Sequence, residues 1–135
     1  MNKIIFLLFL LVLSVNQSQS STKNRQKSPL NSLSKKYVLN MSVVESVKGG
    51  YDKWWQIEII SPLKKEKYTD NETFPGRFNI YWDWDKDDRI WFYNSDDGSI
   101  YYWQNIKGKW LKKKYNRSDK SIKVPCSILP DYSGS

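Results

Sequence analysis

The sequence contains no histidine and only one cysteine, Cys126. The absence of histidine excludes a Ser-His or Cys-His nucleophile system, and it leaves the common zinc ligand sets incomplete. We therefore expect no metal and no cofactor. One cysteine cannot form an internal disulfide, so packing alone must hold the core together. Cys126 is then either a buried apolar residue or an unpaired thiol open to oxidation.

Long apolar runs are absent after the first twenty residues. Ile4–Val15 is about as long as the core of a signal peptide and is shorter than the roughly 20 residues of a membrane-spanning helix. A short basic start precedes this run, and Ser18-Gln19-Ser20 supplies small residues before a cut. We predict a signal peptide at residues 1–20. The protein would be secreted or periplasmic without a later transmembrane span, or membrane-anchored if the signal is not cleaved.

Acidic residues are in the minority. Removing Lys3 from the 22 basic residues leaves 21 against 14 acidic ones, a net charge of +7 for the mature chain. Residues 21–36 are polar and basic and predict a disordered arm. Residues 37–130 would form a single β-rich domain, followed by a flexible tail at residues 131–135. No internal repeat is present.

The domain lacks helix-period patterning and is dominated by β-branched and aromatic residues. Tyr51–Tyr115 holds 17 of the 21 aromatic residues, including all seven tryptophans. Closely spaced turn signals predict an all-β antiparallel meander of about six strands, which forms a small sheet, a sandwich or an open barrel. Residues 61–76 are interpreted as a longer loop. The expected strands are Val38–Val47, Lys53–Ile60, Arg77–Trp84, Arg89–Ser95, Ser99–Gln104 and Lys109–Tyr115.

One piece of the meander, residues 88–110, resembles a single blade of a β-propeller. The resemblance rests on Arg89-Ile90-Trp91, on the Asp97-Gly98 turn and on Tyr101. Because nothing repeats and one blade cannot close a propeller, the resemblance implies a meander sheet and no function.

Loop length fixes which side chains share a face of the sheet. Three-residue loops at Lys86-Asp87-Asp88 and Asp96-Asp97-Gly98 would set Asp85 opposite Arg89 as an ion pair. The same loops would set Trp82 opposite Phe92 and Trp91 opposite Trp103. The first face would then be a core face made of Phe78, Ile80, Trp82, Trp84, Ile90, Phe92, Ile100 and Tyr102. The second face would carry Tyr81, Asp83, Trp91, Tyr93, Tyr101 and Trp103.

The second face has two possible roles. The N-terminal hairpin could fold over it as a second layer, because large aromatic surfaces are usually buried. Alternatively it is an exposed platform, since large apolar patches often mark binding sites. Sugar rings would stack on its aromatic rings and donate hydroxyl hydrogen bonds to Asp83. The candidate ligand-binding residues are Tyr81, Asp83, Trp91, Tyr93, Tyr101 and Trp103.

Charge is unevenly distributed along the domain. Residues 83–97 carry a net −4 and residues 105–123 a net +7. The lysines Lys112, Lys113 and Lys114 either protect a terminal strand from edge-to-edge pairing or attract anionic surfaces. An export signal argues against a nucleic acid partner.

The acidic run has calcium-loop spacing at Asp83, Asp85 and Asp87. An EF-hand needs glycine at the sixth position and glutamate at the twelfth, but Asp88 and Asn94 stand there. We therefore expect a charged turn without a metal.

These features favour a non-catalytic, exported binding module for glycans or an anionic cell-envelope polymer. An extracytoplasmic protein–protein or inhibitor module is the alternative. A small glycosidase is the second alternative, and it would need a carboxylate pair formed by Asp83 with Glu58 or Glu45.

Overall fold

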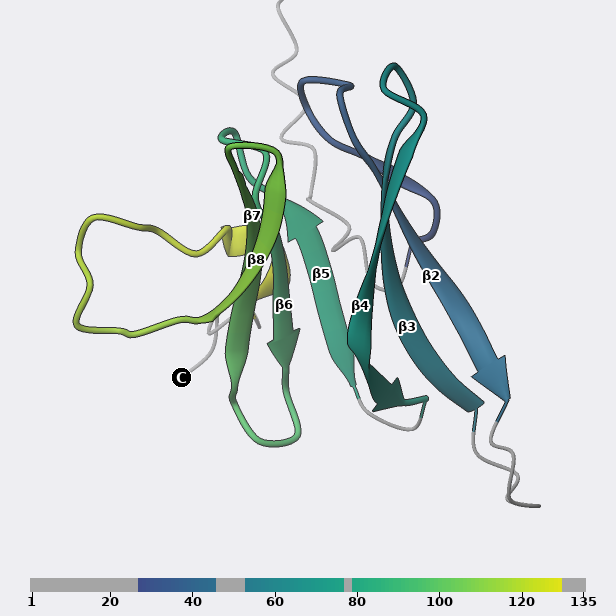
Figure 1. Ribbon diagram of the computed structural model, residues 1–135. Helices are drawn as coiled ribbons and strands as arrows, with labels where there is room; N and C mark the ends of the chain where they lie inside the picture. The colour runs from purple at the N-terminus through teal and green to yellow at the C-terminus, as the bar shows by residue number, and fades with distance from the viewer. Residues whose placement is uncertain (1–26, 46–52, 77–78, 130–135) are drawn as a thin grey trace, which may run out of the picture.

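A computed structural model describes residues 27–45, 53–76 and 79–129 of the 135-residue chain. The predicted signal peptide, the first part of the predicted arm, the tail and Phe78 lie outside these ranges. The fold is all-β, as predicted, and consists of two four-stranded antiparallel sheets (Figure 1). The first sheet contains β1 (Leu30–Asn31), β2 (Val38–Glu45), β3 (Lys53–Ser61) and β4 (Glu66–Pro75). The second contains β5 (Ile80–Trp84), β6 (Ile90–Asn94), β7 (Ile100–Ile106) and β8 (Lys109–Lys114).

Two strands were not predicted. β4 lies inside the segment that was interpreted as a loop, and that interpretation was wrong. β4 is an edge strand with mostly exposed polar residues, so it lacks the apolar alternation that marks a half-buried strand. β1 lies inside the predicted arm, where Leu30 and Ser32 are buried, so the ordered fold begins upstream of Tyr37. Within the described ranges no helix is long and apolar enough to cross a membrane.

The β5–β6 hairpin has the predicted register. Trp82 is paired with Phe92, and the Arg89 Nε donates to Asp85 Oδ2 over 2.6 Å. The β6–β7 register was wrong by one residue. The turn has four residues, Ser95–Gly98, because Asn94 and Ser99 still form a backbone hydrogen bond of 2.9 Å. Trp91 is therefore paired with Tyr102.

This shift of one residue exchanges the two faces of β7, because side chains alternate along a strand. Trp103 and Tyr101 now face the first sheet, together with Trp82 and Phe92. Ile100 and Tyr102 lie on the other face with Trp91.

The main core lies between the two sheets. Its first-sheet side chains come mainly from β2 and β3, and its second-sheet side chains come from β5, β6 and β7. Its buried members are Leu30, Leu39, Met41, Ile57, Ile59, Ile80, Trp82, Trp84, Ile90, Phe92 and Trp103. The N-terminal sheet therefore covers the face that carries Trp82 and Trp84 rather than the face that carries Trp91.

A smaller core lies on the outer face of the second sheet. The chain after β8 swings out and returns over β5 and β6, where it forms the short 3-10 helix η1 (Cys126–Ile128) (Figure 1). Val124 and Ile128 pack there against Trp91, Ile100 and Tyr102. The C-terminal segment, and not the N-terminal hairpin, thus covers this face.

The β7–β8 hairpin turns through two residues, Lys107 and Gly108, with φ of 50° and 83°. Positive φ at both positions is typical of a type I′ turn, and glycine adopts it without a steric cost. The turn sets Trp110 opposite Asn105. Trp110 faces the first sheet, where its ring lies 4.9 Å from Tyr37 and 6.2 Å from Trp84.

Candidate binding site

The predicted aromatic platform is not assembled on one face. Trp91 and Trp103 lie on opposite faces of the second sheet, and both are 0% exposed. Tyr101 accompanies Trp103 toward the first sheet. Tyr81 and Tyr93 remain on the outer face as a half-buried pair with ring centroids 6.2 Å apart. The structure therefore separates the six candidate residues into two groups.

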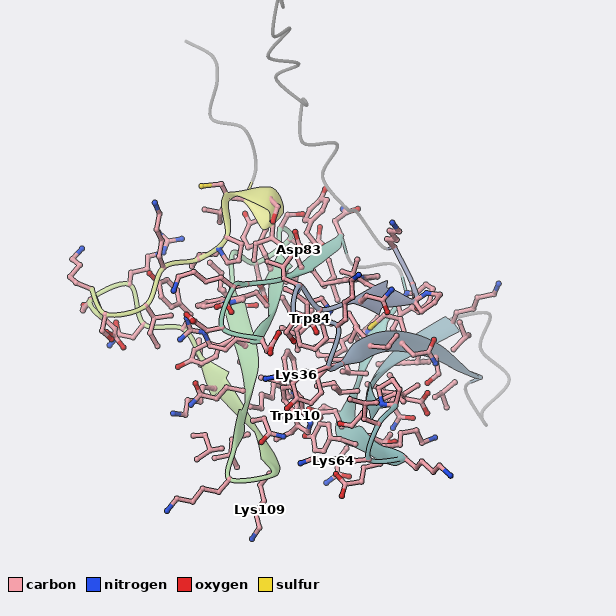
Figure 2. All side chains as sticks on the ribbon, turned by 90° about the horizontal axis from the view of Figure 1, so that it is seen from above. Lys36, Lys64, Asp83, Trp84, Lys109 and Trp110 are labelled. Atoms are coloured by element: carbon pink, nitrogen blue, oxygen red, sulfur yellow. The ribbon has the colours of Figure 1, made fainter. Side chains whose placement is uncertain are left out.

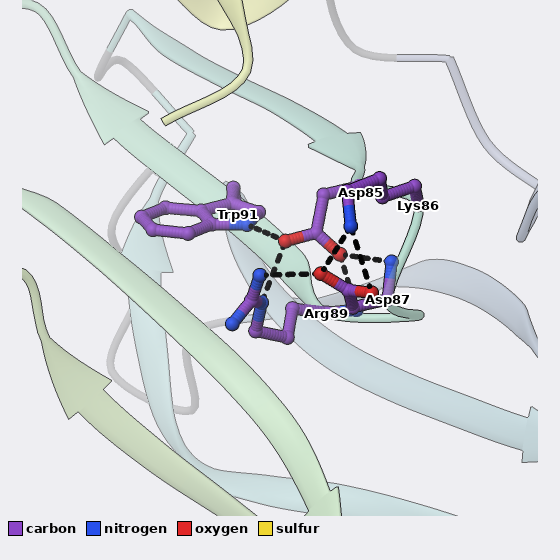
Figure 3. A network of polar contacts seen from close by, with 5 residues as sticks. All are labelled: Asp85, Lys86, Asp87, Arg89 and Trp91. Carbon is purple, nitrogen blue, oxygen red and sulfur yellow. Dashed lines mark hydrogen bonds and ion pairs between the residues drawn. The ribbon is translucent and has the colours of Figure 1, made fainter. Parts of the chain in front are cut away.

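Trp91 is held by the β5–β6 turn (Figure 3). Its Nε1 donates to Asp85 Oδ2 over 2.8 Å, and the backbone N–H groups of Asp87 and Arg89 donate to Asp85 Oδ1. Burial acts to raise the pKa of Asp85, but the hydrogen bonds from Trp91 and Arg89 outweigh it and lower that pKa below its usual value. Both carboxylate oxygens are thus engaged within the protein.

The other two carboxylates of the acidic run have internal partners as well. Asp83 Oδ1 accepts from the backbone N–H of Trp84, and Asp87 pairs with Arg89 and Lys86. In the part of the chain that the structure describes, no cluster of three or more metal-ligating side chains occurs.

Trp103 is held from the other sheet by Asp70. Tyr68 is paired with the buried Ile59, and Asp70 lies two residues later on β4, so both side chains face the second sheet. The β3–β4 register shifts between Gln56 and Glu58, just beyond this point. Asp70 is 4% exposed, and its Oδ2 accepts from Trp103 Nε1 over 2.5 Å. Its Oδ1 accepts from the backbone N–H of Glu72 over 2.8 Å. The hydrogen bond between Asp70 and Trp103 joins the two sheets, and it was not predicted because residues 61–76 were interpreted as a loop.

Lys112 belongs to the same inter-sheet layer rather than to a free basic surface. Its Nζ pairs with Glu72 on β4 and lies 4.8 Å from the ring centroid of Tyr101 and 5.3 Å from that of Trp103. Of the three lysines predicted to contact an anionic surface, Lys113 and Lys114 are exposed.

A cleft opens between the two sheets at one end of the sandwich, which we call the turn end. The turn end holds the β1–β2, β3–β4, β5–β6 and β7–β8 turns, at the top of Figure 1. The cleft has a volume of about 510 Å³ and separates the β3–β4 hairpin from the β7–β8 hairpin. Seen from above in Figure 2, Trp110 lies further into the molecule than Lys64 of one hairpin and Lys109 of the other.

The walls of the cleft combine aromatic and polar side chains. Tyr68 and Trp110 are half-buried and contribute ring surface from opposite sides, and Glu66, Asn105 and Lys109 contribute polar groups. Burial raises the pKa of Tyr68, and the neighbouring Asp70 raises it further. The Tyr68 hydroxyl therefore stays protonated at neutral pH and donates to Asp70 Oδ2 over 3.3 Å.

The charged groups of the cleft differ in their partners and in their exposure to solvent. Lys67 Nζ donates to Glu58 over 2.9 Å, which together with Asn40 lowers the pKa of Glu58. Lys64, Lys65 and Lys109 are exposed at the rim. An acidic ligand would therefore meet positive charge at the rim and aromatic rings inside.

The carboxylates proposed for a glycosidase are not brought together by the fold. Ile57 and Ile59 of β3 are buried toward the second sheet, so Glu58 between them points to the outer face of the first sheet. Trp82 and Trp84 of β5 are likewise buried, so Asp83 points to the outer face of the second sheet. The side chain of Glu45 lies outside the described residues.

Sequence reasoning missed the cleft because its two hairpins, Lys53–Pro75 and Ile100–Lys114, are far apart in the chain and β4 of the first one was interpreted as a loop. The alternation of Tyr68 and Asp70 with polar neighbours was the available signal. No protein-family model, curated protein or solved structure matches this chain.

Proposed function

We propose that this protein is a non-catalytic module that binds an acidic glycan in the cleft at the turn end. The observation that carries the proposal is the cleft itself, about 510 Å³ between two hairpins, with Trp110 and Tyr68 on opposite walls. A volume of this size is within the usual range for small-molecule sites.

The chemistry of the walls matches a sugar acid. The rings of Trp110 and Tyr68 present flat apolar surface to the C–H faces of a pyranose, while Asn105 and Glu66 can hydrogen-bond its hydroxyl groups. The rim lysines Lys64 and Lys109 supply attraction to a carboxylate or sulfate, which raises the local concentration of an anionic ligand.

The test is isothermal titration calorimetry with a uronic-acid oligosaccharide and with its carboxyl-reduced form. The acidic form should bind more tightly, and the difference should shrink at high salt because exposed charges are screened. Trp110→Ala should weaken binding about tenfold or more, since truncation of a central aromatic contact typically costs about 2 kcal/mol. Lys109→Gln should mainly reduce the salt dependence.

Two controls separate loss of the site from loss of the fold. Lys123→Gln removes an exposed lysine from the C-terminal segment and should leave binding unchanged. Trp110→Phe keeps an aromatic side chain against Tyr37 and should retain part of the affinity. Equal binding of the acidic and reduced sugars by wild type and by Lys109→Gln would rule out the proposal.

A further inference from the structure

Three turns at the turn end carry the same combination of side chains. Each presents an exposed aliphatic residue followed closely by two exposed lysines. The aliphatic residues are Leu33 at 72% exposure, Leu63 at 89% and Ile106 at 39%. The lysines that follow them are Lys35 and Lys36, Lys64 and Lys65, and Lys107 and Lys109.

The fold brings these three turns to one end of the molecule. Successive turns of an antiparallel meander alternate between the two ends of a sheet, so the β1–β2 and β3–β4 turns share an end, and the β7–β8 turn joins them there (Figure 1). Ser34 Oγ donates to Asp88 Oδ2 over 2.7 Å, which ties the first turn to the β5–β6 turn. Figure 2 shows Lys36, Lys64 and Lys109 on this end around Trp110.

The lysines occupy backbone positions that lysine does not favour. Lys35, Lys65 and Lys107 have φ of 61°, 55° and 50°, one in each turn. Glycine or asparagine adopts this left-handed conformation at lower cost. The backbone conformation therefore does not explain why lysine occupies these three positions. A positive charge that points outward from each turn would explain it.

The acidic groups near this end are partly compensated within the protein. Asp87 pairs with Arg89 and Lys86, whereas Asp88 has a hydrogen bond from the neutral Ser34 hydroxyl and keeps its charge. Glu66 is exposed beside the β3–β4 turn and offsets one lysine. The turn at the other end of the second sheet carries Asp96 and Asp97.

We infer that the three turns dock the domain onto an anionic phospholipid bilayer. Leu33, Leu63 and Ile106 would enter the boundary between headgroups and acyl chains, and the adjacent lysines would contact the lipid phosphates. A bilayer fits better than a soluble polyanion because a polyanion attracts the lysines but offers no apolar layer to the exposed leucines. This surface shares Lys64, Lys65 and Lys109 with the rim of the glycan cleft, but its exposed aliphatic residues do not line the cleft, and the inference does not rest on the proposed function.

The test measures membrane contact at the β3–β4 turn itself. This is needed because the apolar residues 4–15 of the full chain can bind vesicles independently of the turns. An environment-sensitive dye is attached to Leu63→Cys in a Cys126→Ser background. The matched control carries the dye at Val43→Cys, an exposed aliphatic position at 46% exposure on β2. Both are titrated with phosphatidylcholine vesicles that contain or lack phosphatidylglycerol.

The expected result is a blue shift and a rise in emission for the dye at position 63, with anionic vesicles only. The dye at position 43 should not respond. Replacing Lys64 and Lys65 by Gln should weaken the response about tenfold or more, because each lysine near an anionic surface contributes about a factor of five. Leu33→Ala with Ile106→Ala should also weaken it, since less apolar surface is buried.

Three outcomes would overturn the inference. The first is no response of the dye at position 63, and the second is an equal response at positions 63 and 43. The third is that a soluble acidic polysaccharide fully displaces the domain from the vesicles and the dye shows no blue shift, which would identify a polymer as the partner. Trp110→Ala should leave the vesicle response intact while it weakens glycan binding, so the two proposals fail separately.

Discussion

The hydrogen bond between Asp70 and Trp103 allows a quantitative prediction about how the two sheets are joined. Both side chains are almost fully buried, and the bond spans 2.5 Å across the inter-sheet core. Asp70→Ala removes the acceptor and leaves three donors without this partner: the Trp103 indole N–H, the Tyr68 hydroxyl and the backbone N–H of Glu72. We expect Asp70→Ala to lower the free energy of unfolding substantially.

The magnitude follows from the lost hydrogen bonds. A hydrogen bond to a charged group contributes about 1.5–3 kcal/mol, and a buried unsatisfied donor costs about 1–3 kcal/mol. Removal of a buried carboxylate also relieves a desolvation cost, so we expect a net loss of about 2–4 kcal/mol. For a domain of this size that corresponds to a fall in Tm of roughly 10–25 °C.

The assay is urea denaturation followed by tryptophan fluorescence, arranged as a double-mutant cycle. Trp103→Phe removes the indole donor and keeps an aromatic ring, so Asp70→Ala should cost about 1–2 kcal/mol less in that background. Glu66→Ala on the same strand is the control and should change stability by less than about 0.5 kcal/mol, because Glu66 is exposed. A coupling energy near zero would refute the idea that this bond joins the sheets.

Three further predictions concern the outer face of the second sheet. Trp91→Ala should destabilise the fold by about 3–5 kcal/mol, because Trp91 is 0% exposed and packs under the C-terminal segment; a stable, fully folded variant would contradict this. Asp85→Asn should be less stable than wild type at neutral pH, and the difference should shrink as the pH falls below about 4. The sign follows because the folded state lowers the pKa of Asp85, so its stabilising effect is present above the unfolded pKa and is lost on protonation; a difference that is constant with pH would count against it. Cys126 should react rapidly with a thiol reagent in the native protein, since it is exposed, and protection until unfolding would contradict the structure.

Strand residues with strong β propensity could be recognised from the sequence. The β5–β6 register was predictable because the Asp85–Arg89 pair and the Trp82–Phe92 pair support the same loop length. All-β architecture was likewise predictable from the aromatic, β-branched segments.

The rest depended on details that residue patterns do not encode. A four-residue turn in place of a three-residue turn moved Trp103 from one face to the other, because both faces of β7 are aromatic and either register buries large rings. β4 was not predicted because this edge strand, which contains a bulge, has few apolar residues. The cover over Trp91 was unpredictable since Val124 and Ile128 lie in an irregular segment without strand periodicity.

NMR chemical-shift mapping would locate the ligand on the folded domain. Amide resonances would be followed while a uronic-acid oligosaccharide is added. The largest shifts should occur in the β3–β4 and β7–β8 hairpins, around Tyr68 and Trp110 at the cleft. Shifts concentrated instead on the outer face of the second sheet, around Tyr81 and Tyr93, or no shifts at all, would contradict it.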